Sequence, residues 1–321
     1  MSQISKNSTK KRYFLANNSN LAPKLSNYCK KLFYFADNFV SKRTTQTACK
    51  SACLARQKGS NHPRRLSIRI TDFRILSYLR IFASTNSIKM NRQHIVFLTG
   101  AGISAESGLD VFRGKDGLWT DETLAYLSSS EALYNNTQSC LNFYNERRKR
   151  LAEVEPNEAH KLIAELEKEH EVTVITQNVD NLHERAGSTH VIHLHGELTK
   201  VCSMDNRTTC IKEYPLTTPI LVGDKADDGS QLRPYIVMFG EYVDSMNVAE
   251  EIVSKADIFV VIGTSLHVYP AAGFINYAHP EIPKFVIDPG DMSKCEQLGY
   301  KHFKTTATKG MKLLLEAFKE L

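Results

Sequence analysis

The sequence of 321 residues lacks long apolar runs, and its cysteines are few and irregularly placed. No stretch approaches the roughly 18 uninterrupted apolar residues of a membrane-spanning helix, so we expect no membrane segment. Seven cysteines without regular spacing do not form the pattern of a secreted, disulfide-rich protein, which favours a reducing compartment. Apolar residues make up 42% and charged residues 24%, which argues against a wholly disordered or a fibrous chain.

Acidic residues are nearly absent from residues 1–89. That segment holds only Asp37 and Asp72 of the chain's 35 acidic residues but 18 of its 41 lysines and arginines, so residues 90–321 carry 33 acidic and 23 basic groups. The net charge of +6 therefore conceals a basic segment joined to an acidic body. Because the body has the wrong sign to attract a phosphate backbone, we expect no nucleic-acid partner.

Residues 1–89 contain a single glycine, and only residues 72–83 have the apolar spacing of an amphipathic helix. Three interpretations stay open. The segment could be an organellar transit peptide, or a basic arm that binds nucleic acid or anionic lipid. Alternatively, translation starts at Met90, four residues before the first strand-like run, and the upstream residues are a start-site artefact. We favour the third interpretation and expect residues 1–89 to be poorly ordered.

The acidic body alternates short apolar runs with helical patterns. Its first run, His94-Ile-Val-Phe-Leu-Thr-Gly100, is typical of a buried parallel strand that ends in a glycine turn. Similar runs recur at 172–176, 191–194, 235–239, 258–262 and 284–287, and helical spacing covers 139–154, 156–168 and 309–319. This alternation predicts an α/β fold with a Rossmann-like parallel sheet.

Two segments do not follow the alternation. Residues 118–150, approximately, are mostly helical in pattern, and residues 199–233 are polar and loop-like. We expect both to form a smaller module inserted into the sheet domain, so that residues 90–321 make up one functional domain.

The first strand runs into Gly100-Ala-Gly-Ile-Ser-Ala-Glu-Ser-Gly108. A tight glycine turn after a strand lets backbone N–H groups approach a pyrophosphate, with the positive end of the next helix behind them. A Gly-x-Gly turn alone can equally serve to pack a helix against a strand. The longer pattern, which continues into Phe112-Arg113-Gly114, resembles the sirtuins, the NAD-dependent protein-lysine deacylases.

Four further motifs follow in the order expected of that family. They are Gln177-Asn-Val-Asp180, His193-Leu-His-Gly196, Phe239-Gly-Glu241 and Gly263-Thr-Ser265. The resemblance covers residues 91–310, approximately, and none of the basic segment. A pair such as Asn178 and Asp180 could by itself be a turn and a helix cap, but five motifs in register make coincidence implausible.

The resemblance implies a role for each motif. The family's catalytic histidine directly precedes a glycine, which identifies His195, and His193 is expected to be structural. Phe239, Gly240 and Glu241 are expected to pair with the substrate backbone. The implied NAD-binding residues are Gly100, Ala101, Gly102, Ala105, Glu106, Phe112, Arg113, Gln177, Asn178, Asp180, Gly263, Thr264, Ser265 and Asp288. Asp288 stands where the family commonly has an asparagine at the adenosine ribose.

The resemblance also indicates a subclass. Tyr144 and Arg147 are three residues apart within a helical pattern, so they share a face, which could simply be a solvated surface. In class III sirtuins a Tyr-x-x-Arg at this place binds the far carboxylate of a succinyl or malonyl group. Guanidinium and phenol donors suit one carboxylate. Ala105 and Glu106 also fit the class III form.

The four zinc-binding cysteines of most sirtuins are missing. Only Cys202 and Cys210 lie in the expected segment, and residues 90–321 contain no Cys-x-x-Cys. Because tetrahedral structural zinc needs four ligands, we expect the zinc to be absent and the zinc-ribbon part of the module to be degenerate.

By resemblance, the protein is an NAD-dependent deacylase of acyl-lysine proteins that removes succinyl, malonyl and acetyl groups, with nicotinamide and O-acyl-ADP-ribose as products. Two alternatives would use the same NAD site: mono-ADP-ribosyl transfer to protein, or a non-catalytic NAD-sensing module. A hydride-transferring dehydrogenase would leave four motifs without a role. We expect a monomer in the bacterial cytoplasm, or an organellar protein if the basic segment is a real transit peptide.

Overall fold

The computed structural model describes residues 92–111 and 121–321. The basic segment and Met90 lie outside the described residues, and so do Phe112 and Arg113. The expectations for those residues therefore stay predictions.

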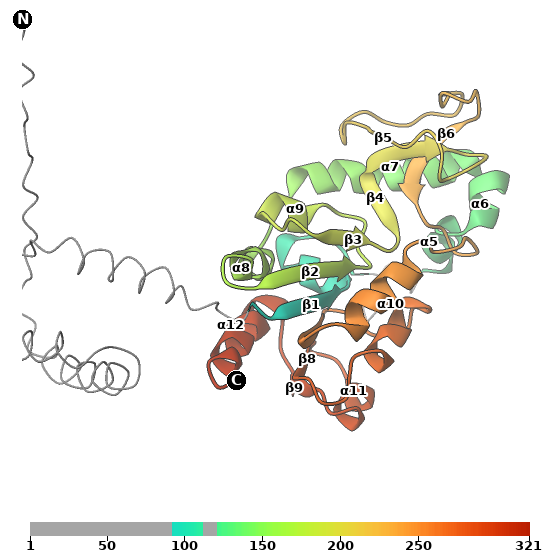
Figure 1. Cartoon of the computed structure of the whole chain (residues 1–321). Coiled ribbons are helices and arrows are strands. Elements are labelled where there is room, and N and C mark those ends of the chain that lie inside the picture. The colour runs from blue at the N-terminus through green and yellow to red at the C-terminus, as the bar shows by residue number, and fades with distance from the viewer. Residues whose placement is uncertain (1–91, 112–120) are drawn as a thin grey trace, which may run out of the picture. The chain divides into compact units, whose positions relative to one another are not determined.

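A six-stranded parallel sheet forms the centre of the described body, with the strand order β3-β2-β1-β7-β8-β9 (Figure 1). Its strands are β1 (His94–Thr99), β2 (Glu171–Thr176), β3 (Val191–His193), β7 (Ile258–Ile262), β8 (Lys284–Ile287) and β9 (Lys301–Phe303). All neighbouring strands pair in parallel. The expected Rossmann-like α/β fold is confirmed.

The central strands are mostly apolar, as is usual for strands that helices cover on both faces of a sheet. On one face, Ile95 and Phe97 of β1 pack in a cluster with residues of α8 (Glu158–Leu166) and α12 (Ala307–Phe318). On the other, Val96 and Leu98 pack with residues of α10 (Met246–Ser254), η3 (Ala271–Asn276) and α11 (Ser293–Gln297). All four β1 side chains are fully buried, so β1 is fixed from both sides. Three short helical segments complete this part: α4 (Ala101–Ser104), η1 (Ala105–Ser107) and α9 (Leu182–Ala186).

A second, three-stranded sheet lies beside the helices α5 (Glu122–Leu127), α6 (Ser130–Asn135) and α7 (Thr137–Glu153) (Figure 1). Its order is β5-β4-β6, with β4 (Gly196–Ser203), β5 (Lys212–Glu213) and β6 (Leu232–Ile236) paired antiparallel. Apolar side chains of α7, including Phe143 and Tyr144, pack in one cluster with Leu198 of β4 and Ile236 of β6. The helices and the small sheet therefore share a core.

One predicted strand was wrong in place and pairing. The sequence predicts a strand of the parallel sheet at 235–239, but β6 covers Leu232–Ile236 and pairs antiparallel with β4 in the small sheet. An apolar run does not reveal its partner, which is why the periodicity misled. Pro234 was the available signal, because a proline is tolerated in a strand only at an edge, and β6 is an edge strand.

Within the described ranges, no helix combines the length and the apolar character that crossing a membrane requires.

Candidate active site

A cavity of about 570 Å³ opens where the carboxyl ends of the parallel strands face the small sheet. Gly100 follows β1, Gln177 follows β2, and Gly263 and Asp288 follow β7 and β8. This edge of an open α/β sheet is the usual place for a ligand. The cavity is lined by every described site residue expected from the sequence except Asp180: Gly100, Ala101, Gly102, Ala105, Glu106, Tyr144, Arg147, Gln177, Asn178, His195, Phe239, Gly240, Glu241, Gly263, Thr264, Ser265 and Asp288.

Two glycine turns meet at the floor of the cavity. The Gly102 amide donates to the Gly263 carbonyl oxygen over 2.8 Å. A Cβ added at Gly102 would lie 2.6 Å from the Gly263 Cα, and Gly263 has a positive φ of 62°. Both positions therefore require glycine, because a side chain at either would push the two turns apart.

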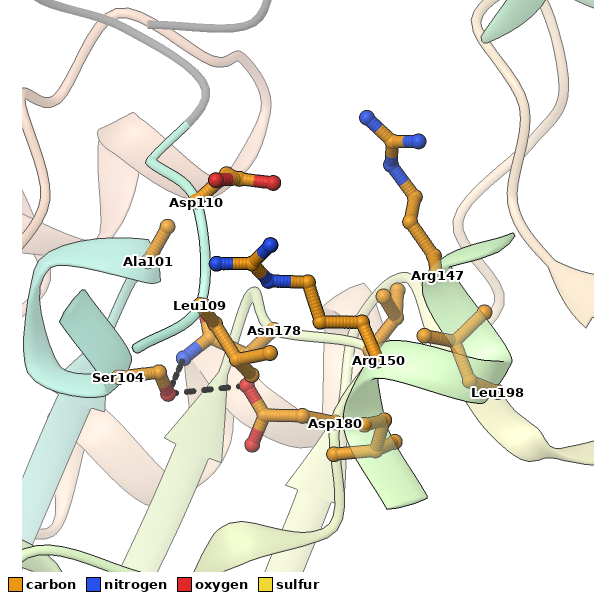
Figure 2. Close-up of a pocket in the computed structure, with 11 residues that line it drawn as sticks. Ala101, Ser104, Leu109, Asp110, Arg147, Arg150, Asn178, Asp180 and Leu198 are labelled. Atoms are coloured by element: carbon orange, nitrogen blue, oxygen red, sulfur yellow. Dashed lines mark hydrogen bonds between the residues drawn. The ribbon is translucent and has the colours of Figure 1, made fainter. Parts of the chain in front are cut away.

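A hydrogen-bonded chain links the first turn to the end of β2 (Figure 2). The Asn178 side-chain amide donates to the Gly100 carbonyl oxygen over 3.1 Å and to Ser104 Oγ over 3.2 Å. Ser104 in turn donates to Asp180 Oδ2 over 2.9 Å. Burial raises the pKa of the Asp180 carboxyl, although bonds from Ser104 and the Leu182 amide partly offset it. Asp180 and Asn178 line a smaller cavity of about 50 Å³ next to the main one.

Ser104 was not among the expected site residues, although it is buried and joins two of them. It lies inside the glycine-rich motif, so a small hydroxyl between two glycines was the signal that could have identified it.

His195 presents one ring nitrogen to the protein. Its Nδ1 lies 2.9 Å from the Gln177 carbonyl oxygen, which can only accept, so the ring proton sits on Nδ1 and the lone pair on Nε2. Burial lowers the pKa of His195, and the Gln177 bond offsets this only in part. The imidazole is therefore neutral near pH 7 and can accept a proton at Nε2.

His193 has both ring nitrogens engaged. Nδ1 lies 3.0 Å from the Asn178 carbonyl oxygen and Nε2 lies 2.7 Å from Glu184 Oε1. Burial would lower the pKa of His193, but the Glu184 carboxylate outweighs it and raises the pKa. Its contacts fix the segment that carries Asn178.

Two acidic residues of the expected NAD set bind the protein's own backbone. The Glu106 carboxylate accepts from the Thr308 amide over 2.8 Å and from Thr308 Oγ1 over 2.6 Å, in the first turn of α12. Asp288 Oδ1 accepts from the Gly290 amide over 2.7 Å, and burial raises the Asp288 pKa. Both still line the cavity, so Glu106 orders its wall and Asp288 keeps a second oxygen.

Tyr144 and Arg147 lie together in the cavity wall on α7. The Tyr144 side chain is buried and its hydroxyl donates to Met238 Sδ over 3.3 Å, and burial raises the Tyr144 pKa to about 12. The Arg147 guanidinium stacks 3.5 Å from the centre of the Phe143 ring and donates to the Phe143 carbonyl oxygen. Burial lowers the Arg147 pKa, and its buried Nε has no hydrogen-bond partner.

No carboxylate in the described ranges lies within ion-pair distance of Arg147. The guanidinium is therefore available to an anionic group that enters the cavity.

Comparison with known proteins identifies the family. The profile of the Sir2 family matches residues 100–270. The chain belongs to the Sir2 family. The resemblance to sirtuins is thereby confirmed.

This sirtuin is similar to curated bacterial proteins. It is 54% identical over 200 residues to an NAD-dependent protein deacylase of Bacteroides thetaiotaomicron, a match that covers 61% of this chain and 86% of the relative. It is 48% identical over 197 residues to an NAD-dependent protein deacylase of Helicobacter pylori, covering 61% and 85%.

Solved Sir2 structures share the fold. A Sir2 homologue in complex with NAD has a TM-score of 0.62 and 33% identity, covering 82% of this chain and 99% of that chain. A Sir2–p53 peptide–NAD⁺ complex has a TM-score of 0.58 and 27% identity, covering 75% and 99%.

Proposed function

We propose that this sirtuin is an NAD-dependent protein-lysine deacylase, which transfers an acyl group from lysine to ADP-ribose and yields nicotinamide and O-acyl-ADP-ribose. The observation that carries the proposal is one cavity that joins the glycine turn, a neutral His195 and the Tyr144–Arg147 pair. The relatives at 48–54% identity are NAD-dependent protein deacylases.

The residues present fit NAD. The Gly102 and Gly263 turns pack so closely that a Cβ on either would collide with the backbone of the other, and this glycine pair lies in the wall of the cavity where a dinucleotide would bind. Asn178 would hold the nicotinamide ribose end and Asp288 the adenosine ribose. When bound, NAD supplies the ADP-ribosyl group that accepts the acyl group. His195 Nε2 takes a proton from a ribose hydroxyl, and the Gln177 carbonyl stabilises the charged ring through Nδ1–H.

We propose that the preferred acyl groups are succinyl and malonyl, with acetyl also accepted. A half-buried guanidinium without a carboxylate partner is unfavourable, and the far carboxylate of such an acyl group would supply the missing partner. The Tyr144 hydroxyl, beside it on the same helix face, would be a further donor when it turns from Met238 Sδ to the acyl carboxylate.

We propose that no structural zinc is bound. Cys202 is buried, and its Sγ donates to the Pro234 carbonyl oxygen. Where the two loops of the small sheet meet, Ser203 Oγ lies 2.8 Å from Ser230 Oγ. The hydroxyls of Ser203 and Ser230 lower the Asp228 pKa to about 2. These hydrogen bonds join the segments that zinc would otherwise join.

We infer acyl-lysine proteins as substrates, a monomeric enzyme and a bacterial cytoplasmic location, with residues 90–321 as the deacylase domain.

One assay tests the function. A peptide with a single lysine, carrying an acetyl, malonyl or succinyl group, is incubated with the full chain, with and without NAD, and nicotinamide and free-lysine peptide are quantified. We expect NAD-dependent loss of the acyl group with equal amounts of nicotinamide. Transfer of labelled ADP-ribose to protein would instead indicate an ADP-ribosyltransferase. NAD binding without turnover would indicate a sensing module.

A further inference from the structure

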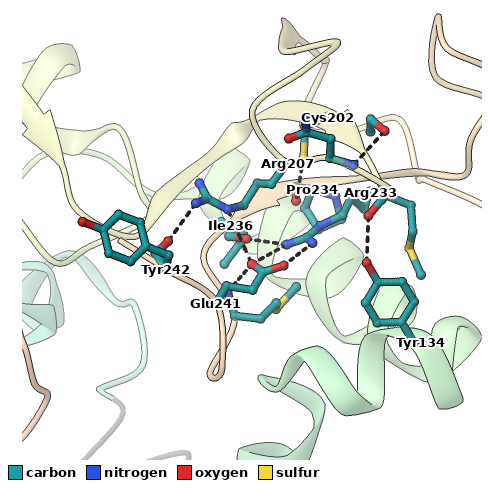
Figure 3. Close-up of polar contacts among 12 residues, drawn as sticks. Tyr134, Cys202, Arg207, Arg233, Pro234, Ile236, Glu241 and Tyr242 are labelled. Carbon is teal, nitrogen blue, oxygen red and sulfur yellow. Dashed lines mark hydrogen bonds and ion pairs between the residues drawn. The ribbon is translucent and has the colours of Figure 1, made fainter. Parts of the chain in front are cut away.

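The segment that lines the substrate side of the cavity is held by a buried ion pair. Arg233 of β6 is 1% exposed, and its Nη1 and Nη2 donate to the two Glu241 oxygens over 2.6 and 3.0 Å (Figure 3). Nη2 also donates to the Ile236 carbonyl oxygen over 2.6 Å. Burial would raise the Glu241 pKa, but Arg233 outweighs it and lowers the pKa, so the carboxylate is ionised. The Arg233 guanidinium therefore binds both ends of the segment 236–241, at the Ile236 carbonyl oxygen and at the Glu241 carboxylate.

Glu241 passes this restraint to the cavity wall. Its Oε2 accepts from the Met238 amide over 2.9 Å, and the Glu241 amide donates to the Met238 carbonyl oxygen. The turn between them contains Gly240, with a φ of 93°. With its carboxylate bound to Arg233 and the Met238 amide, Glu241 acts on a substrate through the shape of this turn.

Residues 237 and 238 contact two groups that the proposed function uses, His195 and the Tyr144 hydroxyl. On one side, Met238 Sδ accepts the Tyr144 hydroxyl over 3.3 Å. On the other, the amide of Val237 donates to the His195 carbonyl oxygen over 2.9 Å. A shift of Met238 would therefore move the Tyr144 hydroxyl and the wall next to His195.

The loop after β4 adds a second cation. Arg207 Nη2 donates to the Tyr242 carbonyl oxygen over 2.8 Å, and its Nε lies 3.6 Å from Glu241 Oε2 (Figure 3). The same Nη2 donates to Asp244 Oδ2 over 2.6 Å. Arg207 thus holds residues just beyond the turn and supports the Glu241 charge.

We propose that Arg233 is a positioning residue for the acyl-lysine site: through Glu241 it sets the turn at 238–241, and through Met238 it sets the Tyr144 hydroxyl. The inference rests on the proposed deacylase function. A bidentate guanidinium suits the role because it fixes both position and angle, which a lysine ammonium does not.

The test separates positioning from folding. In Arg233→Lys the charge stays and the fork is lost, and in Met238→Leu the volume is kept and the sulfur acceptor of Tyr144 is lost. A third variant, Arg233→Met with Glu241→Met, replaces the buried pair by apolar groups and avoids a lone buried charge. Lys212→Met is the matched control, because it breaks the exposed Lys212–Asp227 pair of the same small sheet.

For each variant, peptide affinity without NAD, NAD affinity, kcat and KM are measured on the full chain. We expect Arg233→Lys and the double variant to weaken peptide affinity and raise KM on the order of tenfold to hundredfold. NAD affinity should stay unchanged, as should all values for Lys212→Met. Met238→Leu should lower the succinyl-to-acetyl ratio of kcat/KM.

Two outcomes would overturn the inference. One is unchanged peptide affinity in folded Arg233→Lys and double variants. The other is a loss of NAD affinity in parallel with peptide affinity, which would indicate a purely structural role. Failure of the wild-type chain to turn over any acyl peptide would instead contradict the proposed function itself.

Discussion

The Nδ1 of His195 lies 2.9 Å from the carbonyl oxygen of Gln177, the first residue after β2. This single contact decides the tautomer and turns Nε2 toward its role as the basic atom. Gln177 also donates through its side-chain amide to Thr264 Oγ1 over 3.0 Å. The position of His195 is therefore fixed, through Gln177, by the ends of both β2 and β7.

Replacing His195 by alanine should remove the general base and leave the fold. We expect kcat to fall about 10²- to 10⁴-fold, with the melting temperature and NAD affinity unchanged. Because burial lowers the His195 pKa, the acid limb of the wild-type pH–rate profile should lie below the ordinary histidine value of about 6.5. Steady-state kinetics and calorimetric NAD titration measure these effects. Turnover close to wild type would contradict the assignment of His195.

Arg147 should determine acyl choice. Arg147→Met leaves a succinyl carboxylate unpaired in a buried site, so desuccinylation should lose about 2–5 kcal/mol of transition-state binding. Deacetylation should change little, because a neutral acetyl group has no charge to pair. The readout is the ratio of the two kcat/KM values, with Lys149→Met on the exposed face of the same helix as control. An unchanged ratio would assign Arg147 to packing alone.

Removal of metal should have no effect. Metal analysis of the purified chain should find far less than one zinc per molecule, and a chelator should leave the melting temperature unchanged. Ser203→Ala should cost about 1 kcal/mol because it breaks the hydrogen bond to Ser230. Cys210→Ser should be neutral. Stoichiometric zinc, or unfolding by the chelator, would refute the proposal.

Stability should fall in mild acid through His160. This side chain is fully buried, and burial lowers its pKa to about 4, partly opposed by the Glu184 charge. In the unfolded chain His160 takes up a proton near pH 6.5, whereas in the folded chain it does so only near pH 4. The free energy of unfolding therefore falls progressively as the pH falls from about 6.5 to about 4. The His160 share should be about 2 kcal/mol between pH 7 and pH 5.

Urea unfolding at the two pH values measures this loss. His160→Gln should reduce it, and the exposed His267→Gln should not. Equal losses in wild type and His160→Gln would show that the proton goes elsewhere.

A chain shortened to begin at Met90 should match the full chain in melting temperature and deacylase activity. The expectation follows from the change of composition at residue 90 and from motifs that all lie beyond it. Insolubility or inactivity of the shortened chain would make the basic segment part of the folded protein.

The sequence predicted those parts of the fold and of the site that a short, continuous pattern of residues identifies. The buried strands β1, β2, β7 and β8 are visible as apolar runs, and most of the expected residues that line the cavity sit in contiguous motifs. The sequence did not predict which side chains pair across long separations in the chain. Nothing near Glu241 indicates that its carboxylate binds Arg233, and the helical spacing of α7 does not reveal that Arg148 is fully buried.

Arg148 illustrates the physical reason. Its guanidinium donates to the carbonyl oxygens of Leu198, Pro215 and Thr218. Backbone acceptors carry no residue-type signature, so no pattern in the sequence predicts them.

The contact between Glu106 and Thr308 joins residues 202 positions apart. On a ribosome, the glycine-rich turn after β1 is therefore synthesised early and completed late, because Glu106 meets Thr308 only when α12 has emerged. In the same way, β1 can pair with its parallel neighbour β7 only after the last third of the chain has begun to emerge. A nascent chain that stalls before residue 308 carries every motif of the family and still lacks one wall of its binding site.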